Sequence, residues 1–295
     1  MKKRGKQLDL IGQKERKQPV FHTKEDFLSF IDRDIDEKVA AIAINFAYPL
    51  EPVLINGLLD GIFLYGTKEH EFRGLAEKHI GKEIEMHIGN TQKRSVKVSV
   101  ANDTICLLLS GLIKYQKDEL VCFVLGTGYN AAFFLDDQTA INLEAGNFNK
   151  FPFLDTTKII DKTSAKPGVN VFEKEIAGGY LFQHFNLLAR KKHLLFPPLS
   201  STADLDAIAR NGKKETALAQ NILSHAAELV ACQIAGIAQF KKRNLICVAE
   251  GSLFWNGWNF KEHVELTVKK LAPGYSISFT HIEHSPLIGA AQLIV

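Results

Sequence analysis

Short apolar runs of strand length recur along this chain, and most of them end in a small polar turn that is followed by a segment of helical periodicity. Residues 39–46, 96–100 and 244–249 are three such runs. A strand that is apolar on both faces has to be covered on both sides, as happens where strands alternate with helices. The pattern therefore predicts an α/β protein with a mixed sheet.

Residues 121–134, VCFVLGTGYNAAFF, place a glycine-rich turn between two apolar runs. Glycine and asparagine tolerate positive φ, so Gly126, Gly128 and Asn130 could simply close a β-hairpin. The turn could instead direct backbone N–H groups, with the hydroxyl of Thr127, at an anion. The turn alone leaves both interpretations open.

Helix signals are clearest in the longer amphipathic segments. Thr23 precedes one of them and is a suitable N-cap. Residues 72–80 and 171–188 also have helical periodicity. Residues 216–240, rich in alanine and apolar on most faces, predict a long buried helix, and residues 289–295 predict the start of a last one.

Charge and cysteine usage limit the function classes. The 36 basic and 33 acidic residues give a net charge of +3, which offers no general argument for a nucleic-acid partner. The four cysteines lie in apolar contexts without metal-site spacing, as in a reducing compartment. His281 and His284 lack a third ligand, so no metal site is expected. Since no signal-peptide core or charge-free membrane-spanning run is present, we expect a cytoplasmic protein without a membrane partner.

Polar turns follow the ends of several predicted strands. Asp103 lies in ANDT, Glu144 in LEAG, and Gly251 with Ser252 in AEGS. In open α/β sheets ligands bind at the carboxyl ends of the strands. Asp103 could act there as a general base toward a hydroxyl that attacks a phosphoryl group, or it could cap a helix. Gly251 and Ser252 could bring backbone N–H groups to a nucleotide, or form an ordinary loop.

Four polar residues are candidate ligand contacts. Thr67 and Lys68 could hold a sugar hydroxyl and neutralise developing charge, although a solvated turn lysine is the common case. Glu144 and Glu173 follow apolar segments, and such carboxylates can accept hydrogen bonds from sugar hydroxyls in a polar cleft. Glu173 would equally suit the first turn of a helix, where the dipole favours a negative charge.

Taken in order, these segments resemble the hexokinase family. That family's pattern has TKG, VNDT, GTGTNA, NMEWG, NPGxQxFEKMISGxYLGE and VDGSLY segments, followed by a GKGAAL terminus. The present chain has GTK, NDT, GTGYNA, NLEAG, KPGVNVFEKEIAGGYL and VAEGSLF in the same order. The similarity covers approximately residues 23–295, and its most specific pieces are the FEK helix and the GTG-x-NA turn.

The resemblance implies a two-lobed actin-like ATPase (ribonuclease H-like) fold and transfer of the γ-phosphoryl group of ATP, with Mg²⁺, to the 6-hydroxyl of a glucose-like hexose. Position by position, Asp103 matches the catalytic base, and Lys68 matches a cation at the sugar. The other positions that match sugar contacts are Thr67, Asn102, Asn130, Glu144 and Glu173. The positions that match nucleotide contacts are Gly126, Thr127, Gly128, Gly251 and Ser252.

The chain departs from the family's pattern at its start. The family's LDxGGTxxR hairpin, which holds the ATP phosphates, has no counterpart, and residues 8–12 (LDLIG) echo it only superficially. The first helix begins just after residue 22, where the family has already formed three strands. Ala47 stands where the family has a sugar-binding serine, and Ala145 where it has a tryptophan. The chain therefore resembles a hexokinase with a truncated small lobe.

This interpretation gives a domain prediction and a functional alternative. Residues 1–22 should be a basic, poorly ordered segment, 23–104 the remnant of the small sugar-binding lobe, and 105–295 the large lobe with the nucleotide-side turns. Without the first phosphate hairpin, kinase activity should be weak or lost, because phosphoryl transfer depends on positioning and charge stabilisation. The alternative is a non-catalytic hexose-binding or regulatory relative. Unpaired strand edges in the small lobe would also invite self-association.

Overall fold

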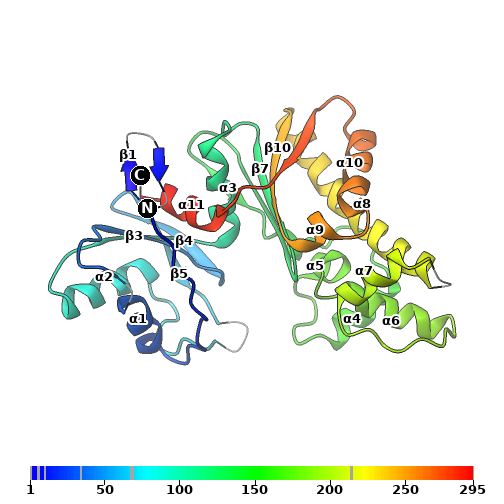
Figure 1. Cartoon of the computed structure of the whole chain (residues 1–295), viewed down its shortest axis with the longest axis horizontal. Helices are drawn as coiled ribbons and strands as arrows, with labels where there is room; N and C mark the ends of the chain where they lie inside the picture. Colours follow the sequence, from blue (N-terminus) through cyan, green and yellow to red (C-terminus); the bar gives the residue numbers. More distant parts are fainter. Residues whose placement is uncertain are drawn as a thin grey trace. The chain divides into compact units, whose positions relative to one another are not determined.

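The computed structural model describes residues 2–4, 7–9, 11–33, 35–66, 70–212 and 215–294, with side chains from residue 11 onward. The chain divides into two compact units (Figure 1). Unit 1 comprises Met1–Lys114 together with Ile282–Val295, and unit 2 comprises Tyr115–His281. This division differs from a boundary after residue 104, since residues 105–114 and the C-terminal segment belong to unit 1.

Unit 2 is built on one mixed five-stranded sheet with the strand order β11-β10-β7-β8-β9. Its strands are β7 (Leu120–Leu125), β8 (Tyr129–Phe134), β9 (Ala140–Asn142), β10 (Leu245–Glu250) and β11 (Ile277–Thr280). β7, β8 and β9 form an antiparallel meander, whereas β10 is parallel to both β7 and β11. The predicted hairpin at residues 121–134 and the mixed sheet are both confirmed.

The helices of unit 2 pack around this sheet and around one long central helix, α8 (Thr216–Lys241). The others are α4 (Asp155–Thr163), α5 (Val171–Ile176), α6 (Leu181–Lys191), α7 (Thr202–Arg210), α9 (Ser252–Asn256) and α10 (Phe260–Leu271), with a 3₁₀ turn η2 (Ala145–Asn147). By length and composition alone α8 could cross a membrane, but 56% of its apolar window is buried within the protein, as in the core helix of a globular unit. The predicted buried helix at 216–240 is thus confirmed.

The predicted single helix at residues 171–188 is wrong. The structure has two helices, α5 and α6, separated by residues 177–180. Gly178 and Gly179 leave the helical path there, and their amides donate to the carbonyls of Gly126 (2.8 Å) and Thr127 (3.0 Å). A Cβ on either glycine would lie 2.7 Å from the same carbonyl oxygens, so only glycine permits this approach.

Unit 1 has shorter sheets. Its strands are β1 (Lys2–Arg4), β2 (Gln7–Asp9), β3 (Ala41–Asn45), β4 (Leu50–Ile55), β5 (Leu58–Phe63) and β6 (Lys97–Ala101). They form three two-stranded pairs: β3 is parallel to β6, and β4–β5 and β1–β2 are antiparallel. Its helices are α1 (Lys24–Asp32), α2 (Ile80–Thr91), α3 (Asp103–Ser110), the 3₁₀ turn η1 (Gly111–Ile113) and α11 (Ser285–Gln292).

Two predicted helices of unit 1 need correction, and one cap is confirmed. The side chain of Thr23 accepts from the amide of Asp26 in a capping box at the start of α1, as predicted. Residues 72–80 are not a helix, because Phe72 and Glu77 have φ of 48° and 61°, which a right-handed helix cannot contain. The last helix begins at Ser285, four residues before the predicted start.

Candidate functional site

The GTG turn joins β7 to β8. Its carbonyls at Gly126 and Thr127 accept from Gly178 and Gly179, and the Gly126 amide donates to the Gly128 carbonyl (3.0 Å). Within the described residues, the amides of Thr127 and Gly128 make no hydrogen bond. The side chain of Thr127 is exposed beside them. The turn is therefore held rigidly from behind while its donors remain available to an anion.

The glycines of this turn are not required for positive φ, because neither Gly126 nor Gly128 is in the left-handed region. Asn130 is not there either, so the alternative in which these three residues supply positive φ is not supported. The reason at Gly128 is close approach: a Cβ would lie 2.6 Å from Oε2 of Glu173. The turn thus makes room for a carboxylate.

Glu173 lies in the first turn of α5 and points at the start of β8. Its Oε2 accepts from the Tyr129 amide (2.9 Å), and its Oε1 accepts from Nδ2 of Asn170 (3.4 Å). Burial raises the pKa of Glu173, and the charge of Glu144 adds to the rise, while the Tyr129 amide opposes it. Each oxygen of this partly desolvated carboxylate accepts one hydrogen bond and can accept another, so Glu173 can bind hydroxyls of a polyhydroxyl ligand.

Asn130 and Glu144 are joined by a residue that sequence reasoning missed, Asn142. Nδ2 of Asn130 donates to Oδ1 of Asn142 (2.8 Å), and Nδ2 of Asn142 donates to Oε1 of Glu144 (2.7 Å). Oδ1 of Asn130 accepts from the amides of Ala131 (2.8 Å) and Ala145 (3.0 Å). The available signal was the NLEAG segment itself, whose asparagine is Asn142. The chain of amides fixes the orientation of Asn130 and places Glu144 at the surface.

Gly251 makes the closest backbone approach of the site. It has φ of 111°, and a Cβ would lie 2.0 Å from the carbonyl oxygen of Leu125 at the end of β7. This contact brings Ser252 beside the GTG turn, where a pocket of about 310 Å³ opens. Its lining consists of Gly126, Thr127, Gly178, Thr202, Ala203, Asp206, Ser252, Leu253, Asn256 and Gly257. This lining offers hydroxyls, amides, glycines and the carboxylate of Asp206, which pairs with Arg210, and among the described residues it includes no Lys or Arg.

The two candidates of unit 1 lie where β6 leads into α3. Asn102 is the N-cap of this helix, and its Oδ1 accepts from the Ile105 amide (2.9 Å). Asp103 is the first helical residue, and its Oδ1 accepts from the Thr104 amide (2.8 Å). The cap is therefore Asn102, so the alternative of Asp103 as the capping residue is not supported. Asp103 remains partly exposed.

The structure gives less information on the remaining predicted positions and on metal binding. Thr67 and Lys68 lie outside the described residues. In the parts of the chain that the structure describes, no group of three His, Cys, Asp or Glu side chains could hold a metal ion. Unit 2 thus brings together Asn130, Glu144 and Glu173 with the GTG turn, and it places Gly251 and Ser252 at the same turn.

Comparisons with known proteins address the origin of this arrangement. A family model described as Hexokinase matches residues 120–196 and 210–295, which is more than half of the chain. A hexokinase-2 of Candida albicans is 24% identical, with 84% of this chain and 63% of that protein aligned. A hexokinase-7 of Oryza sativa subsp. japonica is 29% identical over 50% of this chain and 34% of that protein. The chain thus spans between one third and just under two thirds of these relatives' length.

Solved structures support the fold. A hexokinase from Schistosoma mansoni, complexed with glucose, superposes with a TM-score of 0.70 at 20% identity, covering 92% of this chain and 73% of that one. A ROK hexokinase from Thermus thermophilus superposes with a TM-score of 0.61 at 16% identity, covering 92% and 84%. These matches confirm the predicted α/β fold of the actin-like ATPase type.

Proposed function

The chain belongs to the hexokinase family. From this premise we propose that it binds a glucose-like hexose and transfers a phosphoryl group from ATP, with Mg²⁺, to the 6-hydroxyl of the sugar. We propose that this kinase activity is weak or has been lost. The observation that carries the proposal is the position of Glu173. One side chain contacts the GTG turn through the Tyr129 amide and lies close to Glu144. Sugar-type acceptors and phosphate-type donors are therefore adjacent within unit 2.

In this proposal the carboxylates and amides of unit 2 hold the sugar. Glu173 accepts from a hexose hydroxyl, and its burial makes each such hydrogen bond stronger than in water. Asn130 is oriented by the amides of Ala131 and Ala145, so it is preorganised rather than recruited on binding. Glu144, which is exposed, adds a rim contact.

Asp103 is proposed as the general base. Asn102 caps α3, and Asp103 keeps one oxygen, Oδ2, for a proton while its Oδ1 accepts from the Thr104 amide. The free Nδ2 of Asn102 would donate to the sugar. Lys68 is proposed as a second sugar contact near the transferred group, on the strength of the sequence match.

The nucleotide would be held by backbone rather than by cations. The Thr127 and Gly128 amides suit phosphate oxygens, and the pocket beside Gly251 and Ser252 suits the nucleoside side. Mg²⁺ would be brought by the nucleotide and would neutralise charge on its phosphates. Because the described lining of the pocket carries Asp206 and no Lys or Arg, affinity for ATP should be low and sensitive to magnesium.

We propose a low rate for a chain of these 295 residues alone, because they contain no LDxGGTxxR segment for a second phosphate-binding turn. Removing one well-placed donor can cost ~10²–10³ in rate, and a whole turn should cost more. This observation favours the second candidate, a hexose-binding or regulatory relative without catalysis. In either case we propose a cytoplasmic location.

The test is formation of hexose 6-phosphate from glucose and Mg-ATP by the full chain. The variant Asp103→Asn should abolish any turnover, while Asp155→Asn, an 80% exposed carboxylate in unit 2, should leave it unchanged. Robust turnover in the parent chain would contradict the weak-activity proposal. Turnover that survives Asp103→Asn would contradict the proposal that Asp103 is the general base.

A binding measurement separates the two candidates. Glucose should raise the melting temperature of the parent chain and of Asp103→Asn, but not of Glu173→Gln. Stabilisation by glucose without turnover would support a sugar-binding relative. Absence of both turnover and stabilisation would contradict the proposed function in both forms.

A further inference from the structure

β3 has the sequence of a buried strand but not its environment. Its residues, AIAIN, carry no charge, yet every one of them is only partly buried. The neighbouring strand β6 has four buried residues of five. Among the described strands β3 pairs with β6 alone. One long edge of an apolar strand is therefore left open.

The hydrogen bonds identify which groups lie on the open edge. The Lys97 amide donates to the Ala40 carbonyl (3.2 Å), and the Phe46 amide donates to the Ala101 carbonyl (2.9 Å). Backbone groups alternate in direction along a strand, so the even-numbered residues face β6. The amides and carbonyls that face away belong to Ala41, Ala43 and Asn45, and none of them has a hydrogen-bond partner in the described part of the chain.

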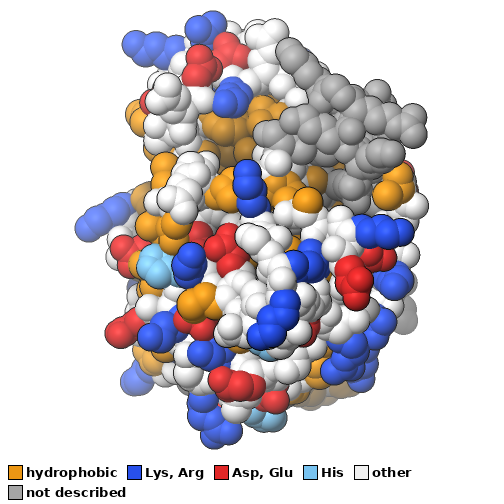
Figure 2. Space-filling model, turned by 90° about the vertical axis from the view of Figure 1, so that its left-hand side faces the viewer, with side chains coloured by type: hydrophobic (Ala, Val, Ile, Leu, Met, Phe, Trp, Pro, Cys, Tyr) orange, Lys and Arg blue, Asp and Glu red, His pale blue; other side chains and the backbone are white. Residues whose placement is uncertain are grey.

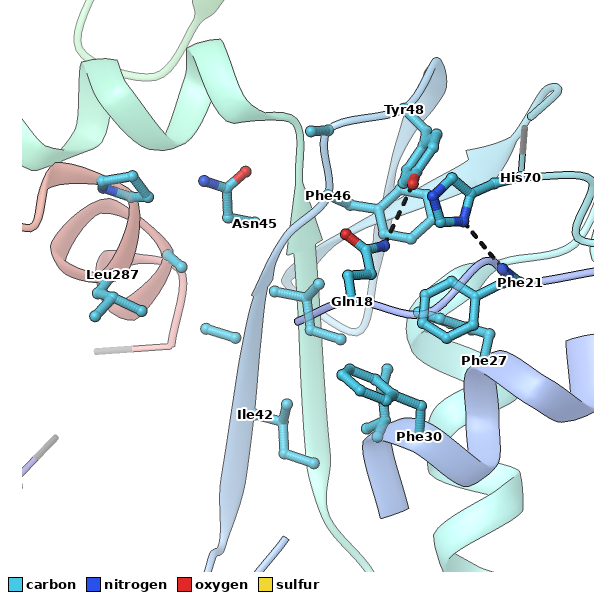
Figure 3. A pocket seen from close by; sticks show the side chains of 16 residues that line it. Gln18, Phe21, Phe27, Phe30, Ile42, Asn45, Phe46, Tyr48, His70 and Leu287 are labelled. Carbon is cyan, nitrogen blue, oxygen red and sulfur yellow. Dashed lines mark hydrogen bonds between the residues drawn. The ribbon is translucent and has the colours of Figure 1, made fainter. Parts of the chain in front are cut away.

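A groove of about 500 Å³ runs beside this edge. Figure 3 shows Leu287 of α11 on one side of β3, with Phe27 and Phe30 of α1 on the other. At one end Nε2 of Gln18 donates to the Tyr48 hydroxyl (3.3 Å). Figure 2 shows hydrophobic side chains reaching the surface in the upper part of the view. The groove thus offers an apolar wall on each face of the strand.

A buried polar atom also lacks its partner at this edge. Oδ1 of Asn45 is inaccessible and accepts no hydrogen bond. An unpaired buried amide oxygen is destabilising, and a change of side-chain rotamer at Asn45 would be needed for this atom to reach a donor at the edge.

We propose that the open edge of β3 binds β3 of a second copy of this chain in an antiparallel pair, which makes a four-stranded sheet across a twofold axis. An added strand satisfies the outward amides and carbonyls, and its alternating side chains pack on α1 at one face and α11 at the other. Only an extended segment meets both requirements.

A second copy fits because the edge is complementary to itself. Side chains project from the faces of a sheet and not across its edge, so two copies of β3 can pair through their backbone groups at normal strand spacing. The strand has no proline, lysine or bulge, which are the devices that keep natural edges apart. The net charge of +3 gives only weak repulsion between copies.

The test is the mass of the full chain in solution, by light scattering and sedimentation over a wide range of concentration. The parent chain should dimerise. Ala43→Pro removes an outward N–H without removing a β3–β6 hydrogen bond, and it should weaken the dimer at least ~10-fold, or 1.4 kcal/mol. Leu287, which is 43% exposed, lies on the groove wall, so Leu287→Lys places a charge there and should weaken the dimer by a similar factor.

Matched controls guard against unfolding. Ala43→Ser keeps the N–H, and Leu266→Lys alters a 58% exposed leucine of unit 2, so both should dimerise as the parent does. A parent chain that is monomeric at every concentration would overturn the proposal. So would a dimer that persists in Leu287→Lys and in Ala43→Pro, or a monomer whose Ala43 amide is protected from exchange. If Ala43→Pro does not fold, Leu287→Lys decides.

Discussion

The two units contain equally apolar strands that end in different environments. β7 (LVCFVL) has five buried residues of six and lies inside a five-stranded sheet. β3 (AIAIN) has none that is fully buried and lies in a two-stranded sheet. A strand is buried by the strands and helices beside it, so an apolar composition favours burial but does not determine how much of the strand is buried.

The difference extends to the candidate site. In unit 2, Glu173, Asn130 and the GTG turn are held by hydrogen bonds from three separate segments. In unit 1, Asn102 and Asp103 follow a strand, β6, whose sheet has one other member. We therefore expect the proposed sugar and phosphate contacts of unit 2 to be held more rigidly than the proposed general base of unit 1.

Hydrogen exchange should show the largest difference between the units. Amides of β7 and β10 should exchange on the order of 10²-fold or more slowly than those of β3 at a dilution that keeps the chain monomeric. Within β3, Ile42 and Ile44, which face β6, should be slower than Ala43. Equal protection of β3 and β7 would break the comparison.

A single methyl group at Gly251 should destabilise unit 2 strongly. Gly251→Ala combines a φ of 111° with a Cβ that would lie 2.0 Å from the Leu125 carbonyl. Strain and overpacking together should cost about 3 kcal/mol or more in chemical denaturation. The control Gly236→Ala, in α8 with open space around the new Cβ, should stabilise by up to ~1 kcal/mol. Similar stabilities for the two variants would contradict the close approach.

The cap of α3 should contribute a smaller amount in unit 1. Asn102→Ala should lower the free energy of unfolding of unit 1 by about 1 kcal/mol, because the Ile105 amide loses its acceptor. Asn102→Asp keeps the acceptor and should retain stability, but it removes an amide donor and should weaken glucose binding. Equal destabilisation by both variants would show that the cap is not the cause.

The smallest expected effect is the change of stability with pH that is caused by the titration of Glu173. Burial raises its pKa above the ordinary value of 4.5, so the folded state binds this proton more tightly than the unfolded chain does. Its contribution to stability is therefore greatest at low pH and falls as pH rises from 4.5 through the raised pKa. Glu173→Gln should remove this shallow decline from the pH profile of melting temperature.

The control for that profile is Glu283→Gln, whose carboxylate is 85% exposed. It should leave the decline unchanged. A Glu173→Gln profile that parallels the parent's would mean that the Glu173 carboxylate is not desolvated in the folded chain.

The sequence by itself determined what neighbouring residues control. The hairpin at residues 121–134, the Thr23 cap and the buried helix α8 were all predictable, because turns, caps and apolar periodicity depend on residues a few positions apart. The order of the motifs was also sufficient to predict the family. The positions of the candidate contacts followed from that order.

Tertiary structure decided what depends on distant segments. The helix expected at 171–188 is interrupted where the amides of Gly178 and Gly179 donate to the carbonyls of the GTG turn, which lies far earlier in the chain. Gly128 is glycine because of a carboxylate, Glu173, whose contact at Tyr129 spans 44 residues. The open edge of β3 likewise could not be read from AIAIN, since burial depends on which strands lie beside it and not on its own side chains.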